Sequence, residues 1–531
     1  MPRTTKTAPA APSTMKELKD TLWKAADKLR GSMDASQYKD VILGLVFLKY
    51  VSDAFDERRT AIRTELEADG YDTDQISELI DDTDEYTGRG VFWVPANARW
   101  GHLAENAKSS EPERPIGALI DEAMDAIMQA NPQLAGTLPR IFNRENVDQR
   151  RLGELIDLFN SARFAGQGQA GQTGRRARDL LGEVYEYFLE KFAAAEGKRG
   201  GEFYTPAGVV RVLVELLQPT HGRVYDPACG SGGMFVQAEK FLEAHHGEGA
   251  DISVYGQELN ERTWRMAKMN LAIHGLTGNL GPRWGDTFAR DLHPDLQADY
   301  IMANPPFNIK DWARNESDPR WRYGVPPTGN ANYAWIQHIL SKLAPGGQAG
   351  VVMANGSMSS NSGGEGQIRA EIVEADLVSC MVALPTQLFR STGIPVCVWF
   401  FAKDKGKRAG EVLFIDARNL GHMVDRAERA LSDDDIAKIA GTFHAWMGIE
   451  SDAAPTVYAD VPGFAYSATL AEIKAADYAL TPGRYVGTPD LGNNEPSEEK
   501  LLRLQAELEA HFVESARLAA VVREQLGRVD V

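Results

Sequence analysis

Hydrophobic residues recur at helical spacing through the first third of the chain. One apolar face comprises Leu18, Leu22, Ala25, Ala26 and Leu29. Residues 40–55 are apolar nearly all round, which is typical of a helix buried in a protein core. Shorter helical patterns follow at 74–80, 116–130 and 146–159. We therefore predict a disordered tail over 1–14 and a helical N-terminal domain over 15–164.

The pattern changes after a Gly- and Gln-rich segment at 165–174, whose composition is that of a flexible loop or linker. A helix with an apolar face begins at Asp179, and short apolar runs then alternate with helical patterns. Strands are expected at 221–225, 252–256, 299–302, 349–354, 379–384, 396–402 and 412–416, with a further strand ending at Asp286. This alternation predicts an α/β domain over 175–420, with a sheet of seven or eight strands and helices on both faces.

The C-terminal extension, 421–531, reads as helical and irregular. Ser432 and the three aspartates after it predict a capped helix. The final helix opens after Ser497, and its apolar positions are Leu501, Leu504, Leu508, Phe512, Ala516, Ala519, Val522 and Leu526. Such a face packs either on its own domain, the commoner case, or on a partner.

The sequence Asn304-Pro305-Pro306-Phe307 follows one predicted strand directly. Neither proline can donate to a β-ladder, so the strand ends in a rigid spur at its carboxyl end, where open α/β sheets bind ligands. Asn304 and the carbonyl of Pro305 supply acceptors, and Phe307 supplies a flat apolar face. The arrangement suits a planar ring that carries an exocyclic amino group.

A glycine-rich turn follows the first predicted strand of the sheet. It combines the strand-end carboxylate of Asp226 with Gly230, Ser231, Gly232 and Gly233, and it fits neither the P-loop nor the dinucleotide pattern. An acid at this position favours a cationic ligand group, such as the ammonium end of S-adenosylmethionine. The loop before the preceding helix, Glu202, Phe203, Tyr204, Thr205 and Pro206, is either a simple cap or a surface whose aromatic rings contact a sulfonium or a base.

Two more acids follow at successive predicted strand ends. Glu258 stands where doubly wound folds bind ribose hydroxyls, and Asp286 is suited to accept from an adenine amino group. Taken singly, each acid is better explained as a helix N-cap. Asp226, Glu258, Asp286 and Asn304 in regular succession are hard to explain as caps alone.

Composition limits what the chain can do by itself. A net charge of −18 argues against a protein that holds DNA unaided. The three cysteines are too few and too scattered for a disulfide framework, no zinc-ligand spacing is present, and no apolar run is long enough for a membrane span. We expect a cytoplasmic protein without a catalytic metal.

The segment 308–329 interleaves basic and aromatic residues beside the Asn-Pro-Pro-Phe motif. They are Lys310, Arg314, Arg320, Trp321, Arg322 and Tyr323. Such a loop either contacts nucleic acid or is a solvated loop packed by its own aromatic rings.

Together these motifs resemble the modification subunit of type I restriction-modification systems, a family of adenine-N6 DNA methyltransferases. The resemblance rests on residues 179–187, 200–206, 226–233, 304–307, 321–327, 355–356, 367–369, 384–389 and 392–395. It implies a Rossmann-like class I S-adenosylmethionine-dependent methyltransferase sheet with a helical N-terminal domain and a helical C-terminal extension.

The resemblance also implies methyl transfer to a flipped-out adenine. Asn304, Pro305, Pro306 and Phe307 would form the catalytic motif, and the loop 202–206, the glycine turn and the two downstream acids would bind the cofactor. The implied partners are double-stranded DNA, a specificity subunit held by the C-terminal helix, a second copy of the chain and a restriction subunit. Two alternatives remain open at this point: a protein glutamine N-methyltransferase and a non-catalytic assembly subunit.

Overall fold

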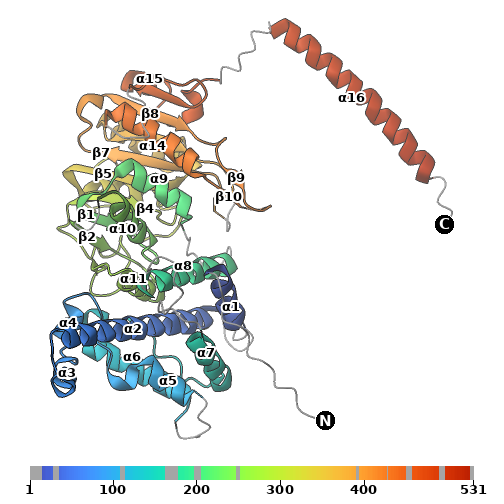
Figure 1. Ribbon diagram of the computed structural model, residues 1–531. Helices are drawn as coiled ribbons and strands as arrows, with labels where there is room; N and C mark the ends of the chain where they lie inside the picture. The colour runs from blue at the N-terminus through green and yellow to red at the C-terminus, as the bar shows by residue number, and fades with distance from the viewer. Residues whose placement is uncertain are drawn as a thin grey trace.

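The computed structural model describes residues 15–27, 35–107, 114–161, 177–196, 205–246, 251–389, 394–426, 428–449, 457–488 and 497–526. The predicted tail and the predicted linker at 165–174 lie outside these ranges. Figure 1 shows a helical N-terminal part, a sheet covered by helices, and a long C-terminal helix that extends away from both.

The N-terminal part is built around one long helix, α2 (Ala35–Ala68). Around it lie α1 (Met15–Asp27), α3 (Thr73–Leu79), α4 (Asp84–Thr87), α5 (Trp100–Asn106), α6 (Ile116–Ala130) and α7 (Gln149–Ser161), with short 3-10 turns at Ala96–Ala98 and Pro132–Leu134. The nearly all-apolar stretch of α2 is fully buried: Val41, Leu45 and Leu48 are 0% exposed. This confirms the predicted core helix.

Helix α8 (Ala177–Glu196) connects the two parts of the molecule. Its apolar face, with Val184, Tyr185 and Phe188, belongs to the same hydrophobic core as α2. Met266 and Ile273 of helix α11 (Glu261–Ile273), which follows a strand of the sheet, also enter that core. The N-terminal helices therefore pack directly on the sheet domain beside α11.

Within the described residues, nine strands form one mixed sheet in the order β11-β8-β6-β7-β5-β4-β1-β2-β3. The strands are β1 (His221–Asp226), β2 (Asp251–Gly256), β3 (Gly278–Asn279), β4 (Ala298–Ala303), β5 (Leu343–Ala354), β6 (Val378–Ala383), β7 (Val396–Ala402), β8 (Glu411–Asp416) and β11 (Ala465–Thr469). Strand β7 runs antiparallel between β5 and β6, and β11 runs antiparallel to β8. A small separate ribbon pairs β9 (His422–Met423) with β10 (Arg429–Ala430).

Helices cover both faces of this sheet, as the alternating pattern predicts. One face packs under α9 (Ala207–Leu217), α10 (Gly233–His246), α11 and α14 (Asp433–Met447). The other packs under α12 (Asn332–Lys342), α13 (Glu365–Glu374) and α15 (Leu470–Ala475). The α/β class and the flanking helical segments are thus confirmed.

Two details of the sheet differ from the prediction. The third strand is β3, two residues long and already finished at Asn279, so Asp286 lies in a loop and not at a strand end. The sheet also gains β11 from the extension that we expected to be helical and irregular. The segment 465–469 is short and consists mostly of small residues, and it pairs with β8, which lies far from it in the sequence. The local sequence pattern therefore did not predict a strand here.

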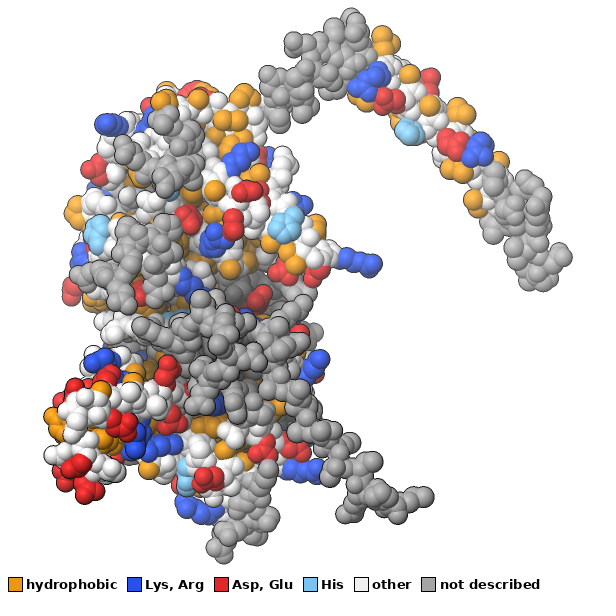
Figure 2. Space-filling view, viewed as in Figure 1, with side chains coloured by type: hydrophobic (Ala, Val, Ile, Leu, Met, Phe, Trp, Pro, Cys, Tyr) orange, Lys and Arg blue, Asp and Glu red, His pale blue; other side chains and the backbone are white. Residues whose placement is uncertain are grey.

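Helix α16 (Ser497–Leu526) stands apart from the described remainder of the molecule (Figure 1). Its large apolar side chains lie open to solvent: Leu501 is 66% exposed, Phe512 65% and Val513 71%. Figure 2 shows hydrophobic side chains along it with charged ones between them. Across the described ranges, no helix is both long and apolar enough to cross a membrane.

Candidate functional site

The strand order brings the predicted site residues to one edge of the sheet. Strand β1 lies between β4 and β2 and runs parallel to both, with Tyr225 opposite Ile301 and Asp226 opposite Gly256. The chain leaves these three neighbouring strands at Asp226, Glu258 and Asn304. The connections that follow the neighbouring strands β1 and β4 pass over opposite faces of the sheet, through α10 and α12, and open α/β sheets form their ligand crevice at such a position.

A cavity of about 660 Å³ opens at this edge. Its walls include Gly230 and Ser231 of the glycine turn, Glu258, Asp286 and Asn304. Pro306 and Trp335 close the side nearest the Asn-Pro-Pro-Phe motif, and Lys39 of α2 reaches the cavity from the N-terminal helices. The volume suits a nucleoside-sized ligand.

A smaller cavity of about 70 Å³ lies on the other side of the glycine turn. It is lined by Glu186, Thr205, Asp226, Gln237 and Asn270, among others, and it shares Gly230, Ser231 and Asn304 with the larger cavity. The glycine turn and Asn304 therefore line two neighbouring compartments, one large and one small.

The glycine turn needs its glycines for backbone conformation. Gly230 has φ of 53° and Gly232 has φ of 79°, in the region that side chains with a Cβ avoid. Glu258 stabilises this turn, because its Oε2 accepts the Gly230 N–H at 3.1 Å and its Oε1 accepts the Asn260 N–H at 2.8 Å. The carboxylate thus joins the turn after β1 to the end of β2.

The other two acids also accept hydrogen bonds from the turns that follow them. Asp226 Oδ1 accepts the Ala228 N–H at 2.9 Å, and Asp286 Oδ1 accepts the Phe288 N–H at 2.8 Å. No helix in the described residues has one of these acids as its N-cap, and α11 is capped by Asn260. Each acid instead orders a turn while its residue lines a cavity, and its contact with a ligand stays a prediction.

Asp226 is the most perturbed of these groups. Burial raises the pKa of its carboxyl from 3.8 to about 8; the Ala228 N–H opposes the rise, and the nearby charge of Glu258 adds to it. A buried carboxyl with this environment favours a cation as its neighbour, because a positive group would restore its charged form.

Two buried carboxamides complete the polar lining. Asn304 donates from Nδ2 to Thr205 Oγ1 at 2.9 Å, while its buried Oδ1 has no hydrogen-bond partner among the residues that the structure describes. Asn270 donates from Nδ2 to the Ser231 carbonyl at 2.9 Å, and its Oδ1 is likewise buried without a partner in the described part of the chain. Unsatisfied buried acceptors are costly, so both oxygens indicate sites for a donor on a ligand.

The remaining predicted residues are placed less directly. Pro305 is buried, the Pro306 carbonyl accepts from Trp335 Nε1 at 3.2 Å, and Phe307 is 8% exposed within the hydrophobic core of one sheet face. Pro206 begins helix α9, and Gly232 packs against Ala267. Glu202, Phe203 and Tyr204 lie outside the described residues.

The segment 308–329 is a packed loop. Trp312 and Trp321 are each 8% exposed and form a cluster with Phe288 and Trp335. Trp312 Nε1 donates to the Pro327 carbonyl at 3.1 Å and Trp321 Nε1 to the Asn315 carbonyl at 2.7 Å. The aromatic rings therefore fill the loop from inside, as the second of the two interpretations expected.

Sequence patterns missed several lining residues. Asn270 could have been found, because it is a polar residue on the otherwise apolar stripe of α11 formed by Met266, Ala267 and Leu271. Thr287, Phe288 and Trp335 also line the large cavity. They carry no motif of their own and reach the site through tertiary packing alone.

The fold and this strand-end site define a class I methyltransferase. The family model for the N-6 DNA Methylase matches residues 176–494, and that for the HsdM N-terminal domain matches 18–159. A type I restriction enzyme methylase subunit (HindI) of Haemophilus influenzae is 49% identical over 82% of this chain and 99% of its own length. One from Methanocaldococcus jannaschii (MjaIX) is 39% identical over 96% of this chain and 91% of its own length.

A solved structure shows the same fold. The type I restriction-modification methyltransferase subunit from Streptococcus thermophilus aligns with a TM-score of 0.72 at 24% identity, over 89% of this chain and all of that one. The chain thus belongs to the methylase subunits of type I restriction-modification systems, which are adenine-N6 DNA methyltransferases. This membership confirms the expected activity over the protein glutamine and non-catalytic alternatives.

The burial of Asp226 predicts a pH-dependent stability. The folded protein keeps this carboxyl protonated up to about pH 8, whereas the unfolded chain ionises it near its ordinary pKa of 3.8. The stability that this group contributes is therefore fully present below the unfolded-state pKa of 3.8. It is lost as the pH rises through the folded-state pKa of about 8.

We expect Asp226→Asn to raise the melting temperature relative to the parent protein by roughly 5 °C or more at pH 9, and by less at pH 5. Thermal unfolding of both proteins at the two pH values measures this difference. An equal effect at both values would show that Asp226 does not titrate in this range.

Proposed function

We propose that this subunit transfers a methyl group from S-adenosylmethionine to N6 of an adenine flipped out of double-stranded DNA, with Asn304 as the central catalytic residue. The observation that carries the proposal is the position of Asn304. It lines both cavities, and its buried Oδ1 faces no protein donor among the described residues. An exocyclic amino group is a donor that would satisfy this oxygen.

The cavities fit S-adenosylmethionine in chemistry as well as in size. Asp226 and the Asn270 Oδ1 supply acceptors for an ammonium group, Glu258 supplies a carboxylate for ribose hydroxyls, and Asp286 supplies one for an adenine amino group. Family resemblance adds the loop 202–206 and the glycine turn residues Gly230, Ser231, Gly232 and Gly233. When bound, the cofactor supplies an electrophilic methyl group on a sulfonium centre.

The protein's contribution is alignment. Asn304 Oδ1 and the Pro305 carbonyl accept the two N6 hydrogens and so direct the nitrogen lone pair toward the methyl donor. Thr205 holds the other end of the Asn304 amide. A carboxamide is no base, and none is needed before attack, because the amine loses its proton after the new bond has formed.

Phe307 is proposed to stack on the flipped adenine. Its ring stands on the spur immediately after the prolines and is 8% exposed. Flipping costs a few kcal/mol of unstacking and unpairing. Phe307 belongs to the hydrophobic core of one sheet face and lines neither cavity in the free protein, so stacking requires its ring to turn toward the adenine as the base enters.

Helix α16 is proposed to dock on helices of the specificity subunit. Eight of its large apolar side chains are at least 46% exposed: Leu501, Leu502, Leu504, Leu508, Phe512, Val513, Leu518 and Val522. An amphipathic helix of 30 residues with its apolar face in solvent requires a partner surface. With a net charge of −18, the chain also needs a partner to hold DNA tightly. A second copy of the chain and a restriction subunit complete the proposed complex.

Glu258 is expected to bind the cofactor. Glu258→Ala should weaken S-adenosylmethionine by about tenfold or more, because a charged hydrogen bond to the ligand is lost. Calorimetric titration measures this. Glu258→Gln is the conservative control for the turn, since its amide oxygen still accepts one of the two N–H groups, that of Gly230 or that of Asn260. Unchanged affinity in a folded Glu258→Ala variant would remove Glu258 from the site.

Asn304 is expected to act on the substrate and not on the cofactor. Asn304→Ala should lower the rate of DNA methylation roughly 100-fold or more while S-adenosylmethionine still binds. Radiolabelled methyl transfer to DNA in the assembled complex, together with titration of the cofactor, separates the two effects. A comparable methylation rate in the variant would contradict the proposed mechanism.

Deletion of residues 501–531 should impair assembly more than cofactor binding, because α16 is remote from both cavities. The full-length chain alone should bind S-adenosylmethionine but hold DNA weakly and without sequence preference. Adding a specificity subunit should give the full-length chain tight DNA binding and a sequence preference. The truncated chain should gain neither. Size-exclusion and gel-shift experiments test this. Tight, sequence-specific DNA binding by the chain alone would contradict it.

A further inference from the structure

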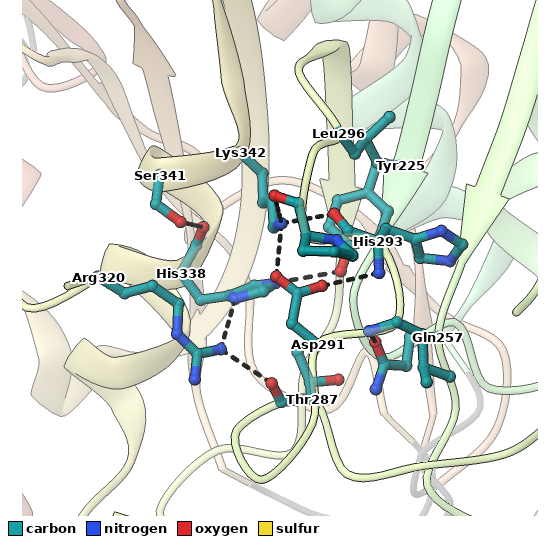
Figure 3. Close-up of polar contacts among 12 residues, drawn as sticks. Tyr225, Gln257, Thr287, Asp291, His293, Leu296, Arg320, His338, Ser341 and Lys342 are labelled. Atoms are coloured by element: carbon teal, nitrogen blue, oxygen red, sulfur yellow. Dashed lines mark hydrogen bonds and ion pairs between the residues drawn. The ribbon is translucent and has the colours of Figure 1, made fainter. Parts of the chain in front are cut away.

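Figure 3 shows a buried polar network around the loop whose residues 286–288 line the large cavity. It joins Tyr225 of β1, the loop 286–294, Arg320 of the packed loop 308–329, and His338 and Lys342 of α12. None of these contacts was expected from the sequence, which placed Arg320 in a loop that either contacts nucleic acid or is solvated and packed by its own aromatic rings. The side chain of Arg320 is in fact only 12% exposed.

Arg320 donates to two successive carbonyls. Its Nη1 lies 2.8 Å from the Thr287 oxygen, and its Nη2 lies 2.9 Å from the Phe288 oxygen. Asp318, 11% exposed, pairs with the same guanidinium at 2.5 Å and neutralises it. The planar guanidinium serves both carbonyls, Asp318 and His338 at the same time, which the three N–H groups of one lysine ammonium cannot do.

His338 fixes the guanidinium from the other side. Arg320 Nη1 lies 3.0 Å from His338 Nδ1 and can only donate, so Nδ1 is the acceptor and the ring proton is on Nε2. Nε2 then donates to the Tyr225 hydroxyl at 3.1 Å. Burial, followed by the charge of Arg320, lowers the pKa of His338 to about 3, which keeps the ring neutral. Arg320 is thereby tied to β1 one residue before Asp226.

The two carbonyls belong to a wall of the large cavity. Asp286, Thr287 and Phe288 all line it. Thr287 Oγ1 donates to the Pro227 carbonyl at 2.7 Å, and the Phe288 ring lies 4.3 Å from that of Trp335. Loss of the Arg320 contacts would leave two carbonyls of this wall without their donors.

The far end of the same loop has its own anchor. Lys342 Nζ donates to the carbonyls of His293 at 2.6 Å and Pro294 at 3.1 Å, and it pairs with Asp291 at 2.5 Å. Gln257 Oε1 accepts the Leu292 N–H at 3.0 Å. Residues 291–294 are therefore held independently, and Arg320 acts on residues 287–288 alone.

We infer that Arg320 is a positioning residue for the cofactor: it sets the Asp286–Phe288 wall against which the adenine ring of S-adenosylmethionine lies, and it couples the order of loop 308–329 to cofactor binding. The inference rests on the proposed placement of the cofactor beside Asp286. Coupling of this kind is reciprocal, so a cofactor that orders the wall also orders the loop.

The test compares two buried arginines. Arg320→Lys removes the fork from the cavity wall. Arg369→Lys is the matched control, because Arg369 is 1% exposed and donates to the Tyr478 and Ser360 carbonyls at 2.7 and 2.6 Å, yet it lines neither cavity. Both variants should lower the melting temperature. Arg320→Lys alone should weaken S-adenosylmethionine, by about tenfold, in a calorimetric titration.

Hydrogen exchange of the full-length chain gives a second readout. Cofactor should slow exchange in both 286–288 and 308–329 of the parent protein, and the protection of 308–329 should be lost in Arg320→Lys. Protection confined to 286–288 in the parent protein would overturn the coupling even if the variant fails to fold. Equal cofactor affinity in Arg320→Lys and Arg369→Lys would overturn the positioning role.

Measuring cofactor affinity in Asp286→Ala distinguishes a failure of the Arg320 inference from a failure of the proposed cofactor site. If Asp286→Ala weakens the cofactor and Arg320→Lys does not, Arg320 has no positioning role and the proposed site stands. If neither change affects affinity, the cofactor does not lie beside Asp286, and both proposals fail.

Discussion

The parallel pairing of β1 with β4 and β2 is the constraint on which the site depends. It brings the ends of three strands, separated by up to about 80 residues of chain, to one edge of the sheet. Asp226, Glu258 and Asn304 need no contact with one another to act together, because the sheet spacing alone places them within the reach of a single ligand. Substituting any one of these side chains changes the site and leaves the pairing intact.

The same pairing has an energetic cost at Asp226. A carboxyl at the end of a central strand is covered by the turn and helix that follow, and burial raises its pKa to about 8. The glycine turn offsets part of this cost by aiming the Ala228 N–H at the carboxyl. In the proposed function, the ammonium end of the cofactor would relieve this cost when it binds.

The sequence predicted the elements well where periodicity was strong, as in α2 and the central strands, and it placed at one sheet edge the residues that line the two cavities. The prediction that Asp286 ends a strand was wrong. Strand β3 is only two residues long, and a local sequence pattern cannot show where so short a strand stops. The sequence could not reveal the role of Arg320 either. Whether a basic residue in a long loop points to solvent or to two carbonyls depends on tertiary contacts with Thr287 and His338, which no spacing in the chain encodes.

The packing of the basic residues in loop 308–329 affects how the chain can bind DNA. Arg320 donates to backbone carbonyls and pairs with Asp318. Arg314 donates to the Pro326 carbonyl and pairs with Glu316. Lys310 and Arg322 are exposed in the same loop, on a chain whose net charge is −18. Affinity for a polyanion grows with the number of phosphates neutralised, so in the proposed complex most of the DNA affinity would come from another subunit. The exposed apolar face of α16 is the surface that such a subunit would cover.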